Sequence, residues 1–301
     1  MPPLLVDLRY RLEYAGLMLL VGIVRLMPID TSARVSAAIW GFIAPRLRRH
    51  RRALDNLAIA YPEKTPAERD AIARAMWRNL GRVMAETMQI DRLIREPHRI
   101  EITNPKVFQR YRNKLGPAIG CSLHLGNWEL AIWPLVVAKA NPAAVYRTVK
   151  NPYVDRYLRY QRRDLYPGGL LGKGKVDGSL EEGQRTARQI MDHVRTGGRL
   201  GLVCDLYDKH GLPVPFFGQP AKSVMIPAMI ARRVGARIWL ARCRRVGETS
   251  RFQIDIKELK VPRTANMGED VKTITAAMQA EFEAWIRETP EQWMWSNRRW
   301  S

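Results

Sequence analysis

From about residue 116 onward, short apolar runs alternate with helical patterns, and this alternation constrains the fold more than any other feature. The runs predict strands at Ala118–Leu123, Ala143–Tyr146, Arg199–Cys204, Arg237–Cys243 and Phe252–Ile256. The segments between them predict helices near Leu130–Ala140, Pro152–Leu165, Glu182–Arg195 and Met225–Val234. Strands and helices in alternation are typical of an α/β fold. We therefore expect a single mixed, largely parallel sheet covered by helices.

Length and composition are sufficient for one large domain. The chain has 301 residues, 46% of them hydrophobic, and neither an internal repeat nor a Gly/Ser-rich linker divides it. We expect this domain over residues 28–301, after a separate segment of residues 1–27. Cys121, Cys204 and Cys243 lie in strand-like runs, and their number and spacing fit no metal pattern. We therefore expect reduced, buried thiols, a reducing compartment and no metal site.

The N-terminal segment contains an uncharged stretch, Tyr14–Val24, between Glu13 and Arg25. The stretch is shorter than the ~20 apolar residues that a spanning helix needs. Asp7 and Glu13 do not fit the basic leader of a signal peptide. The pattern favours an uncleaved membrane-anchor helix that lies in or on one leaflet, with arginines at the level of the head groups. An ordinary buried helix is the alternative.

The segment CSLHLGNWE holds the most chemically suggestive pair, His124 and Glu129. Five residues apart on one helix, their side chains would point about 140° away from each other. The pair therefore makes sense only across a change of structure. Gly126 permits a tight turn after the predicted strand, and Asn127 can cap a helix that begins at Trp128. Glu129 could then fold back to the imidazole, and such a base, beside open helix N–H groups, can remove a proton from a hydroxyl.

Two further polar residues, Arg147 and Asp205, each follow a predicted strand. Because ligands gather at the carboxyl ends of strands in such sheets, both side chains could converge with His124 on one cleft. There Arg147 would grip a phosphate group, and Asp205 would help to position the phosphate or the base. A structural ion pair at a strand end is the alternative for each.

Other residues near the cleft are weaker candidates. Ser122 and Cys121 lie close enough to His124 to suggest a nucleophile, but a residue inside a strand seldom reaches a cleft. A purely structural role for His124 also stays open. The other histidines have charged or loop neighbours, are expected to be exposed and are assigned no role: His50, His98, His193 and His210.

The charge is strongly unbalanced, with 50 Lys and Arg against 29 Asp and Glu, a net charge of +21. Such an excess predicts an anionic partner, which could be nucleic acid, anionic lipid or an acidic protein. A nucleic-acid-binding protein would need a recognisable docking module or a repeat of basic and aromatic residues. The sequence contains neither.

Several ordered blocks resemble one known superfamily. HLGNWE resembles the His-x4-Asp or His-x4-Glu motif of the lysophospholipid and lipid A acyltransferases. Three more blocks resemble further parts of that superfamily: RALDNLAIAYPE (52–63), YRTVKNP (146–152) and VPFFG (214–218). The ending PEQWMWSNRRW (290–300) is similar to the tail of its lipid A branch, in which a glutamate at the place of Glu129 is usual. One departure is Leu206, which stands where that branch often has Gln after the aspartate.

The resemblance implies an O-acyltransferase. His124 would be the general base for an acceptor hydroxyl, and Glu129 would fix the imidazole tautomer and stabilise the imidazolium. N–H groups in the turn of Gly126, Asn127 and Trp128 would hold the oxyanion.

The resemblance also implies the substrates and the location. No cofactor is implied, because the acyl donor is a thioester of acyl carrier protein or of coenzyme A. The implied acceptor is an anionic lipid A precursor at the cytoplasmic face of the cell inner membrane. An acidic carrier and a phosphorylated lipid would explain the +21 charge without nucleic acid. The same chemistry on another glycolipid, such as a phosphatidylinositol mannoside, or on an aminolipid is the alternative. A non-enzymatic nucleic-acid-binding protein is a remote one.

Overall fold

The computed structural model describes residues 4–104, 106–107, 116–173 and 180–300, and its central element is a mixed sheet. The described strands of this sheet follow the order β1-β9-β8-β2-β5-β3-β4. Their bounds are β1 Ile100–Ile102, β2 Ala118–Gly126, β3 Pro142–Arg147, β4 Leu170–Lys173, β5 Arg199–Val203, β8 Arg237–Arg245 and β9 Phe252–Leu259. Every neighbouring pair is parallel except β8 with β9. The predicted mixed, largely parallel sheet is thus confirmed.

Helices cover both faces of this sheet. They are α7 Trp133–Val137, α8 Pro152–Arg162, α9 Leu180–Arg195, α10 Ile226–Val234 and α11 Met267–Glu288. Because successive side chains of a strand point to opposite faces, β2 contributes to both sides. Ile119 and Leu123 are buried in the core that also contains Phe282 of α11, whereas Gly120 and Ser122 are half-buried on the other face.

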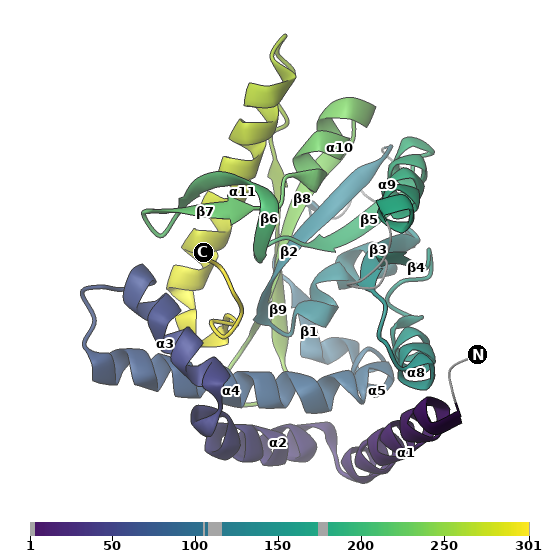
Figure 1. Cartoon of the computed structure of the whole chain (residues 1–301), viewed down its shortest axis with the longest axis vertical. Coiled ribbons are helices and arrows are strands. Elements are labelled where there is room, and N and C mark those ends of the chain that lie inside the picture. Colours follow the sequence, from purple (N-terminus) through teal and green to yellow (C-terminus); the bar gives the residue numbers. More distant parts are fainter. Residues whose placement is uncertain (1–3, 105, 108–115, 174–179, 301) are drawn as a thin grey trace.

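The N-terminal helices lie along one edge of the molecule (Figure 1). They are α1 Leu4–Leu26, α2 Ile29–Ile43, α3 Arg48–Ala60, α4 Pro66–Thr87 and α5 Ile90–Leu93, with a short 3-10 helix, η1 Ala44–Arg46, before α3. Thr65 and Glu68 form a reciprocal capping box at the start of α4. Helix α2 packs along α4, where the Ser36 hydroxyl donates to the Gly81 carbonyl at 2.6 Å. No helix in the described ranges is both long enough and apolar enough to cross a bilayer.

Several elements differ from the sequence-based expectation. In place of one helix over 130–140, a 3-10 helix, η3 Trp128–Ile132, leads into the short α7. An antiparallel hairpin, β6 Tyr207–Phe216 with β7 Gln219–Ser223, was not predicted. Two more short 3-10 helices are η2 Pro97–Arg99 and η4 Pro290–Gln292.

The other histidines differ in burial, whereas the three cysteines are alike. The prediction that His50 is exposed was wrong: it is 7% exposed, and its ring accepts a bond from Trp77 and contacts Asp70 at 2.9 Å. His98 and His210 are exposed and His193 is half-buried. All three cysteines are buried free thiols, as expected.

Gly81 gives a test of the α2–α4 contact. A Cβ at this position would lie 2.6 Å from the Ser36 carbonyl oxygen, so Gly81→Ala should force the helices apart. We expect it to lower the free energy of unfolding by about 1–3 kcal/mol. The matched control is Gly22→Ala on α1, where a Cβ meets nothing within 4 Å and removal of a helical glycine should be neutral or stabilising. Thermal unfolding of both variants checks this, and equal melting temperatures would contradict the packing argument.

Candidate active site

The turn after β2 is built on Gly126. Its φ is +57°, in the left-handed region, and a Cβ there would collide with the main-chain carbonyl of Cys243 on β8. Only glycine therefore allows this turn. His124 lies two residues before it, inside β2, because the strand runs to Gly126 and does not end at Leu123 as predicted.

His124 is held by the carboxylate of Asp205. The two sheet neighbours β2 and β5 are parallel, so Asp205, just after β5, comes level with the end of β2. Its Oδ1 lies 2.8 Å from Nδ1 of His124, and its Oδ2 accepts the main-chain N–H of His124 at 2.8 Å. The indole of Trp293 donates to the same Oδ2 at 2.7 Å. Asp205 is 1% exposed, so the carboxylate exchanges water for these donors.

This contact shifts the pKa of both groups and fixes the tautomer of the imidazole. Burial by itself lowers the pKa of His124 and raises the pKa of Asp205, but the attraction between them outweighs burial. The pKa of His124 is therefore raised above its usual value, and the pKa of Asp205 is lowered below its usual value. With a proton on Nδ1 shared with the carboxylate, Nε2 is the nitrogen left to act as a base.

Glu129 does not fold back to the imidazole as expected. Its carboxylate binds Arg162 of α8 in a two-pronged ion pair, with nitrogen–oxygen distances of 2.5 and 2.8 Å. The reason is local: η3 starts directly after the turn and directs Glu129 to the end of α8, while Asp205 already occupies Nδ1. The charge of Glu129 still helps to raise the pKa of His124 from a longer range.

The turn lies against the imidazole through Trp128. The ring of Trp128 meets the ring of His124 edge to face, with centroids 5.2 Å apart. Asn127 is fully buried, and its side chain does not cap η3. In the described part of the chain, no main-chain carbonyl accepts the N–H of Trp128 or Glu129, whereas Leu130 donates to the Asn127 carbonyl.

A small apolar cavity of about 70 Å³ lies on the same sheet face as His124. Gly120 and Ser122, which line the cavity, alternate with His124 along β2 and share its face, but His124 itself does not line the cavity. Its floor is made by small residues of neighbouring strands, including Gly201 and Ala241. Trp128 and Tyr166 line it from the helical layer, and burial raises the pKa of Tyr166, so that hydroxyl stays neutral. A cavity of this kind suits an uncharged chain.

The remaining predicted site residue, Arg147, ends β3. Its side chain is exposed and has no ion pair or hydrogen bond with the described residues. Asn151 accepts from the main-chain N–H groups of Tyr153 and Val154, and so caps α8. The sheet therefore brings His124 and Asp205 into contact, whereas Arg147 ends β3, which is separated from β2 by β5.

Two residues of this site were not predicted, Arg162 and Trp293. Arg162 stands in the sequence YQRRD, which reads as an ordinary basic helix end, so no signal distinguished it. Trp293 lies in the C-terminal motif, and its clustering with other tryptophans was the available signal.

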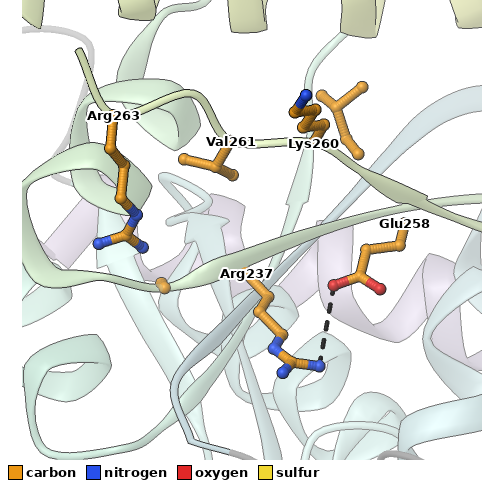
Figure 2. Close-up of a pocket in the computed structure, with 7 residues that line it drawn as sticks. Arg237, Glu258, Lys260, Val261 and Arg263 are labelled. Carbon is orange, nitrogen blue, oxygen red and sulfur yellow. Dashed lines mark ion pairs between the residues drawn. The ribbon is translucent and has the colours of Figure 1, made fainter.

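A larger depression lies elsewhere. It has a volume of about 430 Å³ and lies between the start of β8 and the end of β9, where Arg237 and Glu258 are 3.8 Å apart (Figure 2). Arg237 is level with Ala118 at the amino end of β2. His124 is six residues further along that strand, about 20 Å away. The larger depression therefore does not belong to the site of His124.

Comparison with known proteins agrees with the sequence blocks. The family model described as bacterial lipid A biosynthesis acyltransferase matches residues 3–301. The chain is similar to the lipid A biosynthesis myristoyltransferase of Escherichia coli strain K12, with 26% identity over 260 residues that cover 81% of this chain and 73% of that protein. The lipid A biosynthesis acyltransferase 1 of Shigella flexneri gives the same identity and coverage. Because the family model spans nearly the whole chain, this protein belongs to the bacterial lipid A biosynthesis acyltransferases and is an O-acyltransferase.

Proposed function

We propose that this enzyme moves a fatty acyl chain from acyl carrier protein, or from coenzyme A, to a hydroxyl of a lipid A precursor. The observation that carries the proposal is the imidazole of His124, whose Nδ1 is bound by Asp205 so that Nε2 is left to act as the base. The ring also contacts Trp128, which lines the small cavity. The names of the two relatives support lipid A as the source of the acceptor.

The chemistry follows from this arrangement. Nε2 of His124 takes the proton of the acceptor hydroxyl as its oxygen bonds to the thioester carbonyl carbon. The carbonyl becomes an oxyanion, which the main-chain N–H of Trp128 in the turn would stabilise, since the N–H of Asn127 is directed at the thiol of Cys243. The carbon–sulfur bond then breaks, and the thiolate leaves with the proton from the imidazolium. Asp205 stabilises that imidazolium directly, and Glu129 adds to this from a longer range.

The charged groups suit anionic substrates. Arg147 is free to bind a phosphate of the lipid acceptor or of the carrier's prosthetic group. The net charge of +21 favours both an acidic carrier protein and a polyanionic lipid.

We propose the cytoplasmic face of the inner membrane as the location. Helix α1 exposes a series of apolar side chains, such as Leu19 (67%) and Ile23 (50%), and α2 adds Phe42 (67%). The following segment carries exposed arginines at 46, 48, 49, 51 and 52. Apolar residues beside arginines suit a surface of anionic lipid, because two weak signals together give stable anchoring.

Substitution of the base and its partners tests the mechanism. His124→Ala should lower acyl transfer to a lipid A precursor by about 10²–10⁴-fold with either donor. A base must be neutral, so activity should fall as pH drops through the raised pKa of His124. Asp205→Asn should lower the rate. It should also move the acidic limb of the pH–rate profile, where activity falls, to lower pH, because burial without the carboxylate charge lowers the pKa of His124. Glu129→Gln should also lose activity but move the limb less, because Glu129 does not bond to the imidazole.

The pH–rate profiles of the three variants check these expectations. Near-normal turnover by His124→Ala would rule out the mechanism. A larger shift of the limb in Glu129→Gln than in Asp205→Asn would reverse the two carboxylate roles.

Filling the cavity tests its assignment to the acyl chain. Ala241→Leu should shorten the longest chain that is transferred, because the larger side chain fills the cavity. Each buried CH₂ contributes about 0.8 kcal/mol, so excluding two of them should lower the transfer rate of the longer chain by roughly 15-fold. The measurement is the ratio of long-chain to short-chain transfer from mixed donors. A variant that is merely destabilised would lose both rates equally, and an unchanged ratio would contradict the assignment.

Polar substitutions on α1 and α2 test the location. Leu19→Gln with Phe42→Gln should weaken binding to anionic vesicles by roughly 100-fold, because each loses about 1.5 kcal/mol of apolar burial. The control is Val137→Gln with Met267→Gln, which changes two exposed apolar residues on other helices (46% and 38% exposed). Vesicle sedimentation checks both, and equal losses would argue against a membrane contact through α1 and α2.

A further inference from the structure

A fully buried ion pair lies beside the turn that follows His124, although neither of its residues belongs to the site. Glu86 of α4 is 0% exposed and Arg245 at the end of β8 is 7% exposed. Two guanidinium nitrogens of Arg245 donate to the two carboxylate oxygens at 2.6 and 2.9 Å. Such a pair adds little stability by itself, because removing both charges from water offsets their attraction. The other hydrogen bonds of the two residues therefore indicate its role.

The carboxylate of Glu86 accepts two further hydrogen bonds. Ser250 Oγ donates to Oε1 at 2.7 Å, and the side-chain amide of Asn127 donates to Oε2 at 2.9 Å. Ser250 and Asn127 are both 0% exposed. The first bond leads to the loop after β8, and the second leads to the active-site turn.

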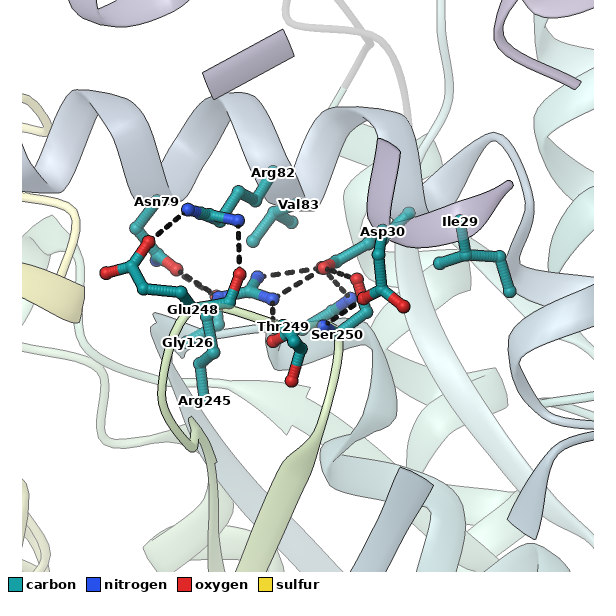
Figure 3. Close-up of polar contacts among 12 residues, drawn as sticks. Ile29, Asp30, Asn79, Arg82, Val83, Gly126, Arg245, Glu248, Thr249 and Ser250 are labelled. Atoms are coloured by element: carbon teal, nitrogen blue, oxygen red, sulfur yellow. Dashed lines mark hydrogen bonds and ion pairs between the residues drawn. The ribbon is translucent and has the colours of Figure 1, made fainter. Parts of the chain in front are cut away.

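Arg245 reaches the same turn by a second route. Its Nε donates to Oδ1 of Asn79 at 3.2 Å, and Nδ2 of Asn79 donates to the Gly126 carbonyl at 3.4 Å. Figure 3 shows Asn79, Arg245 and Gly126 together beneath α4, with Ser250 on the other side of the arginine. Two consecutive residues of the turn are thus attached to one buried pair.

The side chain of Asn127 is oriented by this pair. A carboxylate can only accept hydrogen bonds, so the NH₂ group must face Glu86. Its Oδ1 is then buried without a hydrogen-bond partner. An unpaired buried oxygen costs free energy. Because Asn127 keeps this orientation in spite of the cost, its bond to Glu86 determines the orientation of the side chain. The next residue, Trp128, contacts His124, and the one after it, Glu129, binds Arg162.

We propose that the Glu86–Arg245 pair is a positioning device for the active-site turn and acts through Asn127. The inference rests on the proposed function and extends it, since Asn127 is fully buried and acts on the reaction only by fixing the main chain of the turn. Misplacement of reacting groups by about 1 Å can cost 10²-fold in rate. Substrate affinity and the titration of His124 depend on other contacts, so this device should affect kcat alone.

Asn127→Ala and Ser250→Ala form a matched pair of variants. Each removes one hydrogen bond to the same buried carboxylate, so both should lower the melting temperature similarly. Asn127→Ala should lower kcat by about 10-fold or more while KM and the midpoint of the acidic limb stay unchanged. Ser250→Ala should keep kcat within about 2-fold. Amide hydrogen exchange over residues 124–133 should rise in Asn127→Ala and stay as in the wild type in Ser250→Ala.

Other results would overturn the inference. These are a kcat of Asn127→Ala near the wild-type value, equal losses of kcat in both variants, or unchanged exchange at the turn. If the wild-type protein transfers no acyl chain from either donor, the proposed function fails, and hydrogen exchange alone then decides whether the pair holds the turn.

Discussion

The arrangement of the site depends on one buried carboxylate, that of Asp205. Without partners, a charge at 1% exposure would be strongly destabilising, and three donors offset this cost: two nitrogens of His124 and the indole of Trp293. The donors come from β2 and from the C-terminal tail. Met294 also donates to the carbonyl of His124 at 3.1 Å, so the tail lies against the end of β2. The position of the last residues and the orientation of the base are therefore coupled.

Strands β2, β3, β5, β8 and β9 could be predicted because they are buried apolar runs bounded by turn residues. The edge strands β1 and β4, of three and four residues, are too short to give such a signal and were not predicted. The hairpin β6–β7 could not be predicted either, because Pro213, Pro215 and Pro220 lie within it and prolines argue against strands. Helix α11 carried a readable signal, since Val271, Ile274 and Met278 recur at helical spacing, and the prediction overlooked it. The replacement of one helix by η3 and α7 also had a local signal, because Pro134 lies inside the predicted helix and now stands in the first turn of α7.

In the site, the sequence could identify the groups but not their partners. The rule that ligands gather at strand ends predicts that His124 and Asp205 lie close together. It does not say which carboxylate meets the imidazole. Glu129 is nearer in sequence, yet Asp205 takes Nδ1 because β5 is the sheet neighbour of β2, and strand order is a property of the whole fold. Arg162 attracts Glu129 from another helix, a contact between residues 33 positions apart.

The buried carboxylates in the site and beside its turn are all paired, and this separates the groups that act in the reaction from those that attract substrates. Asp205 with His124, Glu129 with Arg162 and Glu86 with Arg245 each join a carboxylate to a cationic or protonatable group. Developing charge in the reaction therefore meets fixed dipoles and paired charges, with the buried Arg299 as a further cation near Asp205. The excess that gives a net charge of +21 then lies largely on exposed side chains, as in the arginines of residues 46–52. Exposed charge acts over about a Debye length and is screened by salt, whereas buried pairs are screened much less. The surface can thus attract anionic lipids and carriers without disturbing the base.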